Sequence, residues 1–339
     1  MLDVKFSTSF TENWFVGSKF NFLGTKKMAY MISGLAVLIA IAALSTKGLN
    51  PGVDFVGGRS YQVKFDQPVD ANEIKEKLHG VFGSAEAKTF GSADQLRITT
   101  KYKVEEESTV VDNEVNKMLY DNLKEYLPAT LTFQDFMSSD EAHQLGVLQS
   151  SKVGPTIADD LKFDSMKAVL GALAVMFFYI LIRFRRWQFS LGAVIGLAQN
   201  VIIVLGVYSL TYAIMPFNME LDQHLIAAIL TVVGYSINDT VIVFDRVREF
   251  LRNRQSQHTG ESFTDTVNRA LNTTLSRTIN VSLSLVIVLL AIFIFGGESL
   301  RGFIFAILIG IVVGTFTSLF IDTPIMADTM IKSGADKIK

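Results

Sequence analysis

One carboxyl group lies inside an apolar stretch that is long enough to cross a membrane. Asp239 is the single charged residue of segment 224–244. A charged residue within the hydrocarbon costs at least about 2.5–3.5 kcal/mol on insertion scales. A charged residue at such a position is therefore expected to have a function. Such a group can bind and release a proton or coordinate a small cation. A purely structural, hydrogen-bonded Asp is the alternative, but a neutral Asn or Ser would hold helices together at lower cost. Asp239 is therefore the predicted ion-coupling residue.

Four other polar residues are candidates for the same site. Arg277 lies at the edge of the next apolar stretch, where it either pairs with Asp239 or only anchors its helix among the lipid headgroups. Asn238 precedes Asp239. Gln199 and Asn200 lie in the middle of an earlier apolar stretch, where amides are costly unless they bond to a neighbouring helix. They belong to the Asp239 cluster or join helices together.

Other catalytic chemistry is absent from the sequence. The chain has no Cys, which excludes a Cys nucleophile and a Cys-based zinc site. Its four His show no metal-ligand spacing, and no phosphate-binding loop with a GK[ST] ending occurs. We therefore expect no cofactor, no metal and no enzymatic activity.

The composition is that of a membrane protein. Hydrophobic residues make up 49% of the 339 residues and charged residues only 19%. A helix that crosses the hydrocarbon core needs about 20 apolar residues. Six stretches meet this length, and we expect six transmembrane helices near residues 28–46, 166–182, 189–212, 224–244, 278–295 and 302–321.

The net charge of −2 is the sum of two opposite parts. Segment 47–165 carries a net −7, whereas the rest of the chain carries a net +5. Lys and Arg gather in alternate connections between the apolar stretches, which predicts that both termini are cytoplasmic and that the acidic segment lies on the opposite side. A nucleic-acid-binding protein would instead concentrate basic residues on its folded domain.

Segment 47–165 has the pattern of a small α+β domain. Strands are expected at 59–65, 85–90, 95–100 and 130–136, and helices at 70–81, capped by Asp70, and at 108–127. The order β-α-β-β-α-β is the split ferredoxin-like pattern.

The expected organisation has five parts. They are a cytoplasmic segment 1–27, a first transmembrane helix 28–46, a periplasmic domain 47–165, a five-helix transmembrane region 166–322 and a cytoplasmic tail 323–339. The five-helix region includes a cytoplasmic loop 245–275, in which the amphipathic stretch 261–275 suits a helix lying on the membrane surface.

Four motifs in this order resemble the SecF branch of the SecD/SecF family of protein-export membrane proteins, which is part of the resistance-nodulation-division superfamily. They are Gly52-Val-Asp-Phe-Val-Gly-Gly58, Val153-Gly-Pro155, the segment 233–249 around Asp239, and Phe295-Gly-Gly297 with Arg301-Gly-Phe303 after it. Segment 275–278 resembles the functional arginine site of the family and contains Arg277. The likeness covers about residues 20–325.

The resemblance implies a fold, a function and partners. It implies a polytopic inner-membrane protein that works with SecD and uses a proton or sodium gradient to assist late protein export through SecYEG, with YajC and YidC as further candidate partners and the translocating polypeptide as cargo. Asp239 and Arg277 fall on the functional residues of the family. The alternative is a small-molecule or lipid exporter of the same superfamily.

The resemblance also points to a hinge, and the chain departs from the family in two places. Asp54, Gly57 and Gly58 fall on the family motif after the first helix, and Gly154 and Pro155 on the start of the second. Together they imply a hinge between the domain and the helices. Gln199-Asn200 replaces a His-Asp pair of many members, which implies a different coupling ion or a dispensable pair. Residues 1–20 are unlike a typical start, as expected for the C-terminal half of a fused SecDF or for a subunit from a split gene.

Overall fold

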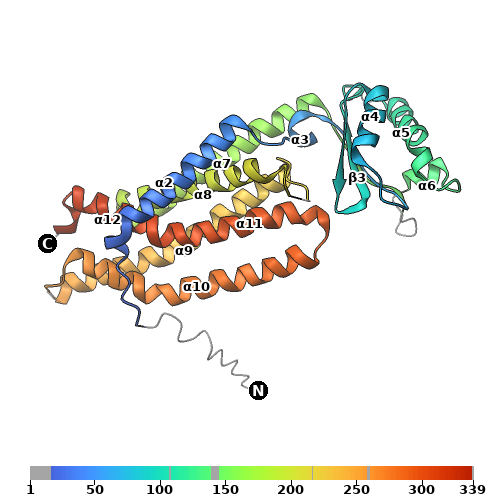
Figure 1. Cartoon of the computed structure of the whole chain (residues 1–339). Coiled ribbons are helices and arrows are strands. Elements are labelled where there is room, and N and C mark those ends of the chain that lie inside the picture. Colours follow the sequence, from blue (N-terminus) through green and yellow to red (C-terminus); the bar gives the residue numbers. More distant parts are fainter. Residues whose placement is uncertain (1–16, 107, 139–144, 216, 258–259, 338–339) are drawn as a thin grey trace, which may run out of the picture.

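Six long apolar helices and one small α+β domain make up the described part of the chain (Figure 1). The structure is a computed structural model that describes residues 17–337 except 107, 139–144, 216 and 258–259. Most of the expected segment 1–27 lies outside the described residues. The helices long and apolar enough to cross a membrane are α2 (Phe22–Thr46), α7 (Pro155–Phe184), α8 (Trp187–Thr211), α9 (Gln223–Gln257), α10 (Phe263–Phe295) and α11 (Glu298–Thr317) with its continuation. The prediction of six spans is confirmed.

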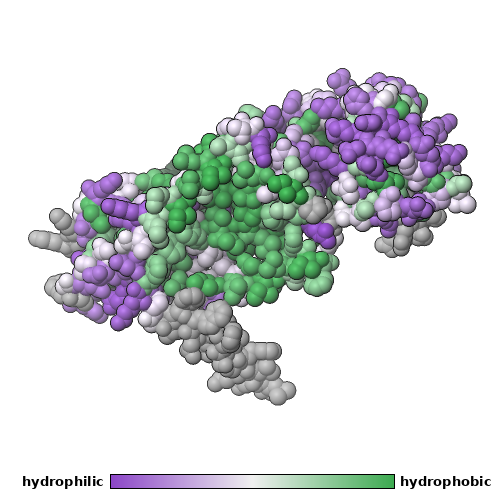
Figure 2. Space-filling view, in the orientation of Figure 1, coloured by the Kyte–Doolittle hydropathy of each residue, from purple (hydrophilic) through white to green (hydrophobic). Residues whose placement is uncertain are grey.

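The apolar surface of these helices faces outward as a continuous band (Figure 2). Large apolar side chains such as Leu38, Phe178 and Ile287 are more than half exposed, which is unfavourable in water and favourable in lipid. Hydrophilic residues border this band at both ends of the bundle (Figure 2). The band therefore marks the part of the molecule that lies in the hydrocarbon.

Helix α8 is central to the bundle because its small residues let other helices approach closely. A Cβ added at Gly206 would overlap Ala40 of α2, and one at Gly192 would overlap the backbone of Asp322. Small residues at such contacts are the usual means of packing helices in a membrane, where apolar burial gives no advantage over lipid. Polar side chains on α8 are thereby held against α9 and the last helices.

The domain between α2 and α7 is a four-stranded antiparallel sheet with helices on one face (Figure 1). Its strands, β1 (Gly58–Lys64), β2 (Ala85–Phe90), β3 (Ser92–Thr100) and β4 (Gly146–Val153), lie in the order β2-β3-β1-β4. Helices α4 (Ala71–Phe82) and α5 (Thr109–Leu123) pack on the sheet through a single apolar core. The order along the chain and across the sheet is the ferredoxin-like one, as the sequence predicts.

One predicted strand of this domain is wrong. Residues 130–136 form a turn and the short helix α6 (Phe133–Met137), and the fourth strand is β4. Thr132 and Asp135 form a capping box, in which each side chain bonds the backbone of the other residue. That local bond starts a helix even though the apolar residues alternate as in a strand, and Phe136 becomes fully buried.

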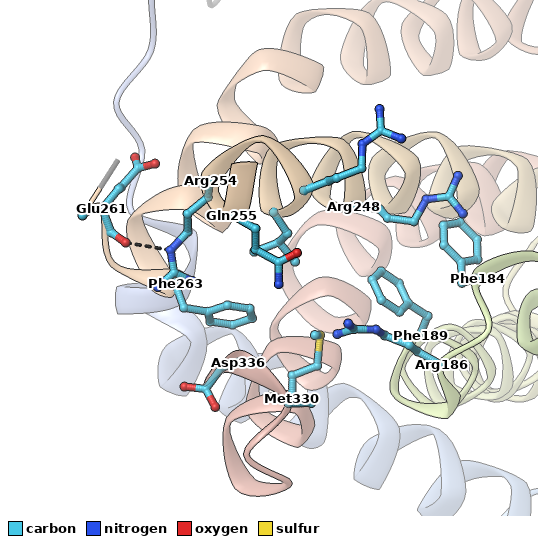
Figure 3. Close-up of a pocket in the computed structure, with 14 residues that line it drawn as sticks. Phe184, Arg186, Phe189, Arg248, Arg254, Gln255, Glu261, Phe263, Met330 and Asp336 are labelled. Atoms are coloured by element: carbon cyan, nitrogen blue, oxygen red, sulfur yellow. Dashed lines mark hydrogen bonds between the residues drawn. The ribbon is translucent and has the colours of Figure 1, made fainter. Parts of the chain in front are cut away.

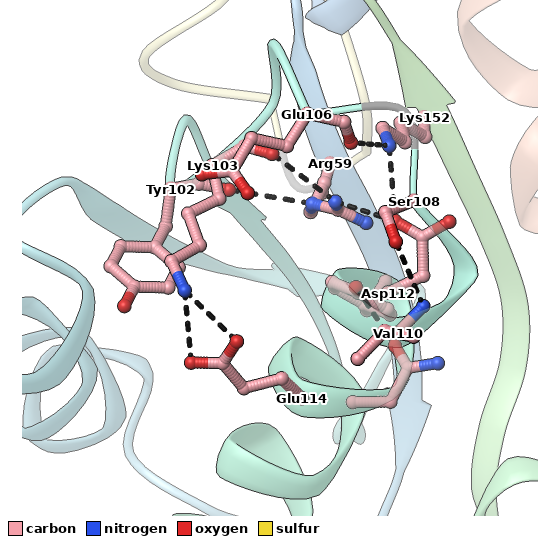
Figure 4. Close-up of polar contacts among 11 residues, drawn as sticks. Arg59, Tyr102, Lys103, Glu106, Ser108, Val110, Asp112, Glu114 and Lys152 are labelled. Atoms are coloured by element: carbon pink, nitrogen blue, oxygen red, sulfur yellow. Dashed lines mark hydrogen bonds and ion pairs between the residues drawn. The ribbon is translucent and has the colours of Figure 1, made fainter.

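An ion network fixes α5 to the sheet (Figure 4). The buried guanidinium of Arg59 on β1 pairs with Asp112 of α5 at 2.6 Å, and Lys152 on β4 pairs with the same carboxylate at 3.0 Å. The Lys152 hydrogen bond and the neighbouring Arg59 hold the pKa of Asp112 below its ordinary value. The carboxylate is thus shared between two neighbouring strands.

Two predicted boundaries in the membrane region also differ from the structure. The expected loop 245–275 is mostly helical, because α9 continues to Gln257 and α10 already begins at Phe263. The amphipathic stretch is therefore the start of α10, and its apolar side buries Val267 and Leu271 against the bundle. The expected tail begins with a helix, α12 (Thr323–Lys332), whose Met326 and Met330 are buried.

Candidate functional site

Asp239 lies on the side of α9 that faces the other helices. Its side chain is 6% exposed, and its Oδ2 is buried without a hydrogen-bond partner among the described residues. Thr278 of α10 is buried beside it, with its hydroxyl close enough to interact with the Asp239 carboxyl group. The position thus combines a buried carboxyl group with a hydroxyl from the neighbouring helix, and the carboxyl Oδ2 remains available for a proton or a small cation.

Arg277 does not pair with Asp239 in this structure. Its side chain is exposed on α10, and it forms no ion pair within 4.0 Å among the described residues. Its charge is nevertheless close enough to act on Asp239 through space. The site therefore holds an Asp and an Arg in the same region without a direct contact.

Asn200 connects three helices next to Asp239. Its amide Nδ2 donates to Ser236 Oγ of α9 at 2.9 Å and to the Gly310 carbonyl of α11 at 3.0 Å. A Cβ added at Gly314 would overlap Ser236 Oγ, so the glycine makes room for this contact. The neighbouring Gln199 is half-buried, and its Nε2 has no partner among the described residues. The structure thus brings Asn200, but not Gln199, into a bonded cluster.

Asn238 points away from this cluster. It is exposed on α9, in line with Thr231 and Gly234, which are exposed as well. Residues 231, 234 and 238 are spaced by three and four positions and share one side of the helix. Asn238 therefore belongs to a polar surface of the bundle rather than to its interior.

A second buried carboxyl group lies next to Asp239. Asp322 is 2% exposed, interacts electrostatically with Asp239, and accepts a hydrogen bond from Thr240 Oγ1 to its Oδ2 at 2.8 Å. Thr240 Oγ1 also lies 2.8 Å from Ser318 Oγ. Asp322 Oδ1 is buried with no partner in the described residues, and it fills the space that a side chain at Gly196 would occupy. Together, Asp239 and Asp322 form a pair of intramembrane carboxyl groups.

Asp322 ends a π-helical turn, Ser318–Asp322, which joins α11 to α12. One extra residue per turn widens the helix locally, and such turns recur at functional sites. The sequence reasoning missed Asp322 because the charge-free run ends at Ile321, which places Asp322 at a helix end. The signal that was available is the apolar spacing of Ile325, Met326 and Met330, which continues the helix beyond the Asp.

The predicted hinge residues meet at one junction between the domain and the helices. Asp54, in the short helix α3 (Val53–Val56), accepts a hydrogen bond on Oδ2 from the Gln223 N–H at the start of α9, at 3.1 Å. Gly57 has a φ of 73° and packs on Pro155, which begins α7: a Cβ there would lie 3.2 Å from the Pro155 Cα. Gly58 approaches the sheet at Thr100 in the same way. Gly154 has ordinary extended geometry and open space around it, so the backbone does not require glycine at that position.

Glu220 forms a second connection between the domain and the helices. It lies in the segment before α9 and pairs with Arg97 of β3 at 3.3 Å. Burial raises the pKa of Glu220, and the adjacent Arg97 charge opposes that rise. Beside this pair, the backbones of Gly52 and Leu221 are hydrogen-bonded at 2.9 Å. The start of α9 is thereby attached both to the sheet and to the segment after α2.

The arrangement defines a class of protein. It is that of a polytopic helical membrane protein with buried carboxyl groups between its helices and a folded domain attached to the same helices. No group of three His, Asp or Glu residues that could hold a metal ion occurs in the described part of the chain.

Comparison with known proteins gives the family. Residues 134–332 match the C-terminal model of the protein export membrane proteins SecD and SecF, and residues 42–69 match the SecD/SecF GG motif. The SecF protein translocase subunit of Rhodothermus marinus is 40% identical over 322 residues, which are 95% of this chain and 96% of that protein. That of Calditerrivibrio nitroreducens is 33% identical over 303 residues, which are 89% and 91% of the two chains. The chain belongs to the SecD/SecF family.

A solved structure agrees with this assignment. The crystal structure of SecDF from Thermus thermophilus, a translocon-associated membrane protein, superposes with a TM-score of 0.73 at 28% identity. The match covers 93% of this chain and 39% of that longer chain. The curated relatives named above are translocase subunits, which favours protein export over small-molecule or lipid export. The chain is thus a multi-pass inner-membrane protein of the Sec translocase.

Proposed function

We propose that this chain uses a proton or sodium gradient, together with SecD, to drive late steps of protein export. Ion binding at Asp239 changes the contacts between α9, α10 and the last helices. The movement of α9 is passed to the 47–165 domain, which then holds or pulls the emerging polypeptide. SecYEG, YajC and YidC are the further partners that the family resemblance implies.

The pair of buried carboxyl groups, Asp239 and Asp322, is the observation that supports ion coupling. A purely structural pair would use its oxygen atoms in hydrogen bonds, because an unsatisfied buried polar atom costs about 1–3 kcal/mol. Each of these two groups instead leaves one buried oxygen without a partner among the described residues. A bound proton or cation would satisfy those oxygens.

The contacts at the start of α9 support transmission to the domain. Asp54 binds the N-terminal end of α9 itself, where a carboxylate is also favoured by the helix dipole. The Glu220–Arg97 pair adds a contact to the sheet. A shift of α9 along or about its axis therefore changes the position of both attachments at once.

The polar surface of α9 and α10 supports a partner subunit within the membrane. Asn238 and Arg277 are exposed on these helices, where lipid would leave their polar groups unsatisfied. A transmembrane helix of another subunit would cover them, and SecD is the subunit that the family membership indicates. The same interface would add groups beside Asp239.

The orientation is also a proposal. The start of α2 and the end of α12 lie at the end of the bundle away from the domain (Figure 1). Arg183, Arg185, Arg186 and Arg248 lie at that end, which by the distribution of positive charge is the cytoplasmic one. The 47–165 domain is then periplasmic.

Replacement of Asp239 by Asn and by Glu tests the coupling. The assay is completion of preprotein translocation into inverted membrane vesicles, with and without an uncoupler. We expect Asp239→Asn to lose the gradient-dependent part of the rate, because the amide cannot bind a proton, and Asp239→Glu to retain some of it. Asp245→Asn is the matched control, since that half-buried carboxylate on the same helix pairs only with Arg183 and Arg248 in the described structure.

Two results would count against the proposal. Full gradient dependence in Asp239→Asn would remove the coupling role. Loss of SecD from the purified complex in the same variant would show that Asp239 serves assembly rather than coupling. Co-purification with SecD is therefore measured alongside the rate.

A further inference from the structure

A cavity of about 880 Å³ opens at the end of the bundle that lies away from the domain. Its apolar wall is made by buried side chains from four different helices: Phe184, Phe189, Phe263 and Met330. Arginine side chains surround this wall, and in Figure 3 the Arg186 guanidinium extends past Phe189 toward Met330. The cavity is thus apolar on one side and positively charged on the other.

Two of its four arginine side chains have no partner among the described residues. The guanidinium groups of Arg186 and Arg252 line the cavity and form no hydrogen bond or ion pair with any described residue. Arg254 is held by its Nε bond to the Glu261 carbonyl at 2.8 Å, and Arg248 pairs with Asp245 at 3.1 Å. The cavity therefore offers guanidinium groups whose donors are free to bind an anion.

The acidic groups of the cavity do not neutralise these arginines. The Glu261 carboxylate pairs with Arg269, outside the cavity, at 2.7 Å. Asp336 lines the cavity, and its Oδ1 is buried without a partner among the described residues. Asp336 would repel an anion, so its removal should strengthen anion binding.

The cavity lies at the level of the lipid headgroups. Helix α7 exposes Phe178 and Ile182 to the lipid at 59% and 76%, and Phe184, which lines the cavity, follows only two residues later. Two helical residues span about 3 Å, whereas the headgroup layer extends roughly 5–7 Å beyond each side of the hydrocarbon. Trp187, 49% exposed at the start of α8, is a residue type enriched at this boundary.

We propose that this cavity binds the phosphate headgroup of an anionic phospholipid, such as cardiolipin or phosphatidylglycerol. Guanidinium groups bind phosphate oxygens with paired hydrogen bonds, and basic pockets between transmembrane helices bind such headgroups. The apolar wall takes the glycerol and the first carbons of the acyl chains, which a free phosphate ion would not need. The lipid connects α7, α8, α9, α10 and α12 at the end opposite the domain.

Lipid binding to the purified full-length chain tests this inference. Native mass spectrometry in mild detergent gives an apparent Kd for cardiolipin and for phosphatidylethanolamine. We expect the double variant Arg186→Gln/Arg252→Gln to bind cardiolipin about 25-fold more weakly, at about fivefold for each charge lost near the headgroup. Binding of phosphatidylethanolamine should stay the same, and Asp336→Asn should bind cardiolipin about fivefold more tightly.

Matched controls separate this site from general charge effects. Arg185→Gln removes the same charge one residue away, at a position that does not line the cavity, and should leave the Kd unchanged. Equal weakening in this control, unchanged binding in the double variant, or displacement of the lipid by excess inorganic phosphate would each overturn the proposal. If the double variant does not fold, the tighter cardiolipin binding expected for Asp336→Asn still tests the proposal, and an unchanged Kd in that variant would overturn it.

Discussion

The contact between Thr240 and Asp322 can be removed with almost no change of shape. Thr240→Val replaces the hydroxyl by a methyl group and keeps the β-branched form that fits the helix. The hydroxyl lies 2.8 Å from both Asp322 Oδ2 and Ser318 Oγ, and 3.0 Å from the Ser236 carbonyl of its own helix. Its single proton can be donated to the carboxylate while the oxygen accepts from Ser318, so two contacts between helical segments are lost.

The expected cost follows from these two contacts. Hydrogen bonds between transmembrane helices contribute about 0.6 kcal/mol on average and up to about 1.7 kcal/mol. The loss also leaves the Asp322 carboxyl with no hydrogen bond to a described residue. We therefore expect the free energy of unfolding to fall by about 1–3 kcal/mol. Reversible unfolding in mixed micelles, followed by circular dichroism, measures it.

A matched variant and a double-mutant cycle test whether the cost comes from the contact between Thr240 and Asp322. Thr329→Val removes a hydroxyl that bonds only to carbonyls of its own helix, at 2.8 and 2.9 Å, and should cost less than about 0.5 kcal/mol. In combination with Asp322→Asn, Thr240→Val should show an interaction energy of at least about 0.5 kcal/mol. The reasoning is refuted if Thr240→Val and Thr329→Val cost the same, or if the cycle is additive.

Three further predictions address other parts of the molecule. Gly196→Ala should destabilise the bundle by about 1–3 kcal/mol, because the added methyl group overlaps the Asp322 carboxylate. The same micelle unfolding assay measures this cost. An unchanged free energy of unfolding would contradict the packing described for this position. The Lys152 hydrogen bond lowers the pKa of Asp112 from 3.8, so the stabilisation that the Asp112 carboxylate gives the domain should be complete above 3.8 and be lost as the pH falls through the lowered pKa. Hydrogen exchange of β1 and β4 as a function of pH measures this loss. The variant Asp112→Asn should lack this acid-dependent change. Glu220→Gln should speed hydrogen exchange in residues 50–58, because the ion pair to β3 is lost, while the core of the domain stays protected.

The sequence predicted the elements whose signals are long or strictly local. The apolar runs gave all six spans, because no soluble structure tolerates such stretches, and Asp70 marked the start of α4, where its side chain bonds the Asn72 N–H. Asp239 was singled out by the same signal, because a charge within an apolar run is costly. The domain topology followed from the order of short strands and helices.

The parts that were missed depend on contacts between distant segments or on competing local bonds. Asp322 lies 83 residues from Asp239, and only the packing of the last helix places them together. Asn238 and Asp239 are adjacent in sequence, but Asn238 is exposed and Asp239 is buried, which depends on where α9 meets its neighbours. At Thr132 a side-chain bond to the backbone outweighed the alternating apolar pattern.

Helix α9 is one uninterrupted rod of 35 residues, or about 52 Å. Asp239 lies sixteen residues from its start, so about 24 Å of rigid helix separates the carboxyl from the contact with Asp54. A pivot of only about 5° at the level of Asp239 would displace that contact by about 2 Å, enough to break a hydrogen bond. The part of α9 on the other side of Asp239 carries Arg248 and Arg252 and would move in the opposite direction. Lipids bound at Arg252 would then act on the C-terminal end of α9, while the exported polypeptide would act on its N-terminal end through the 47–165 domain.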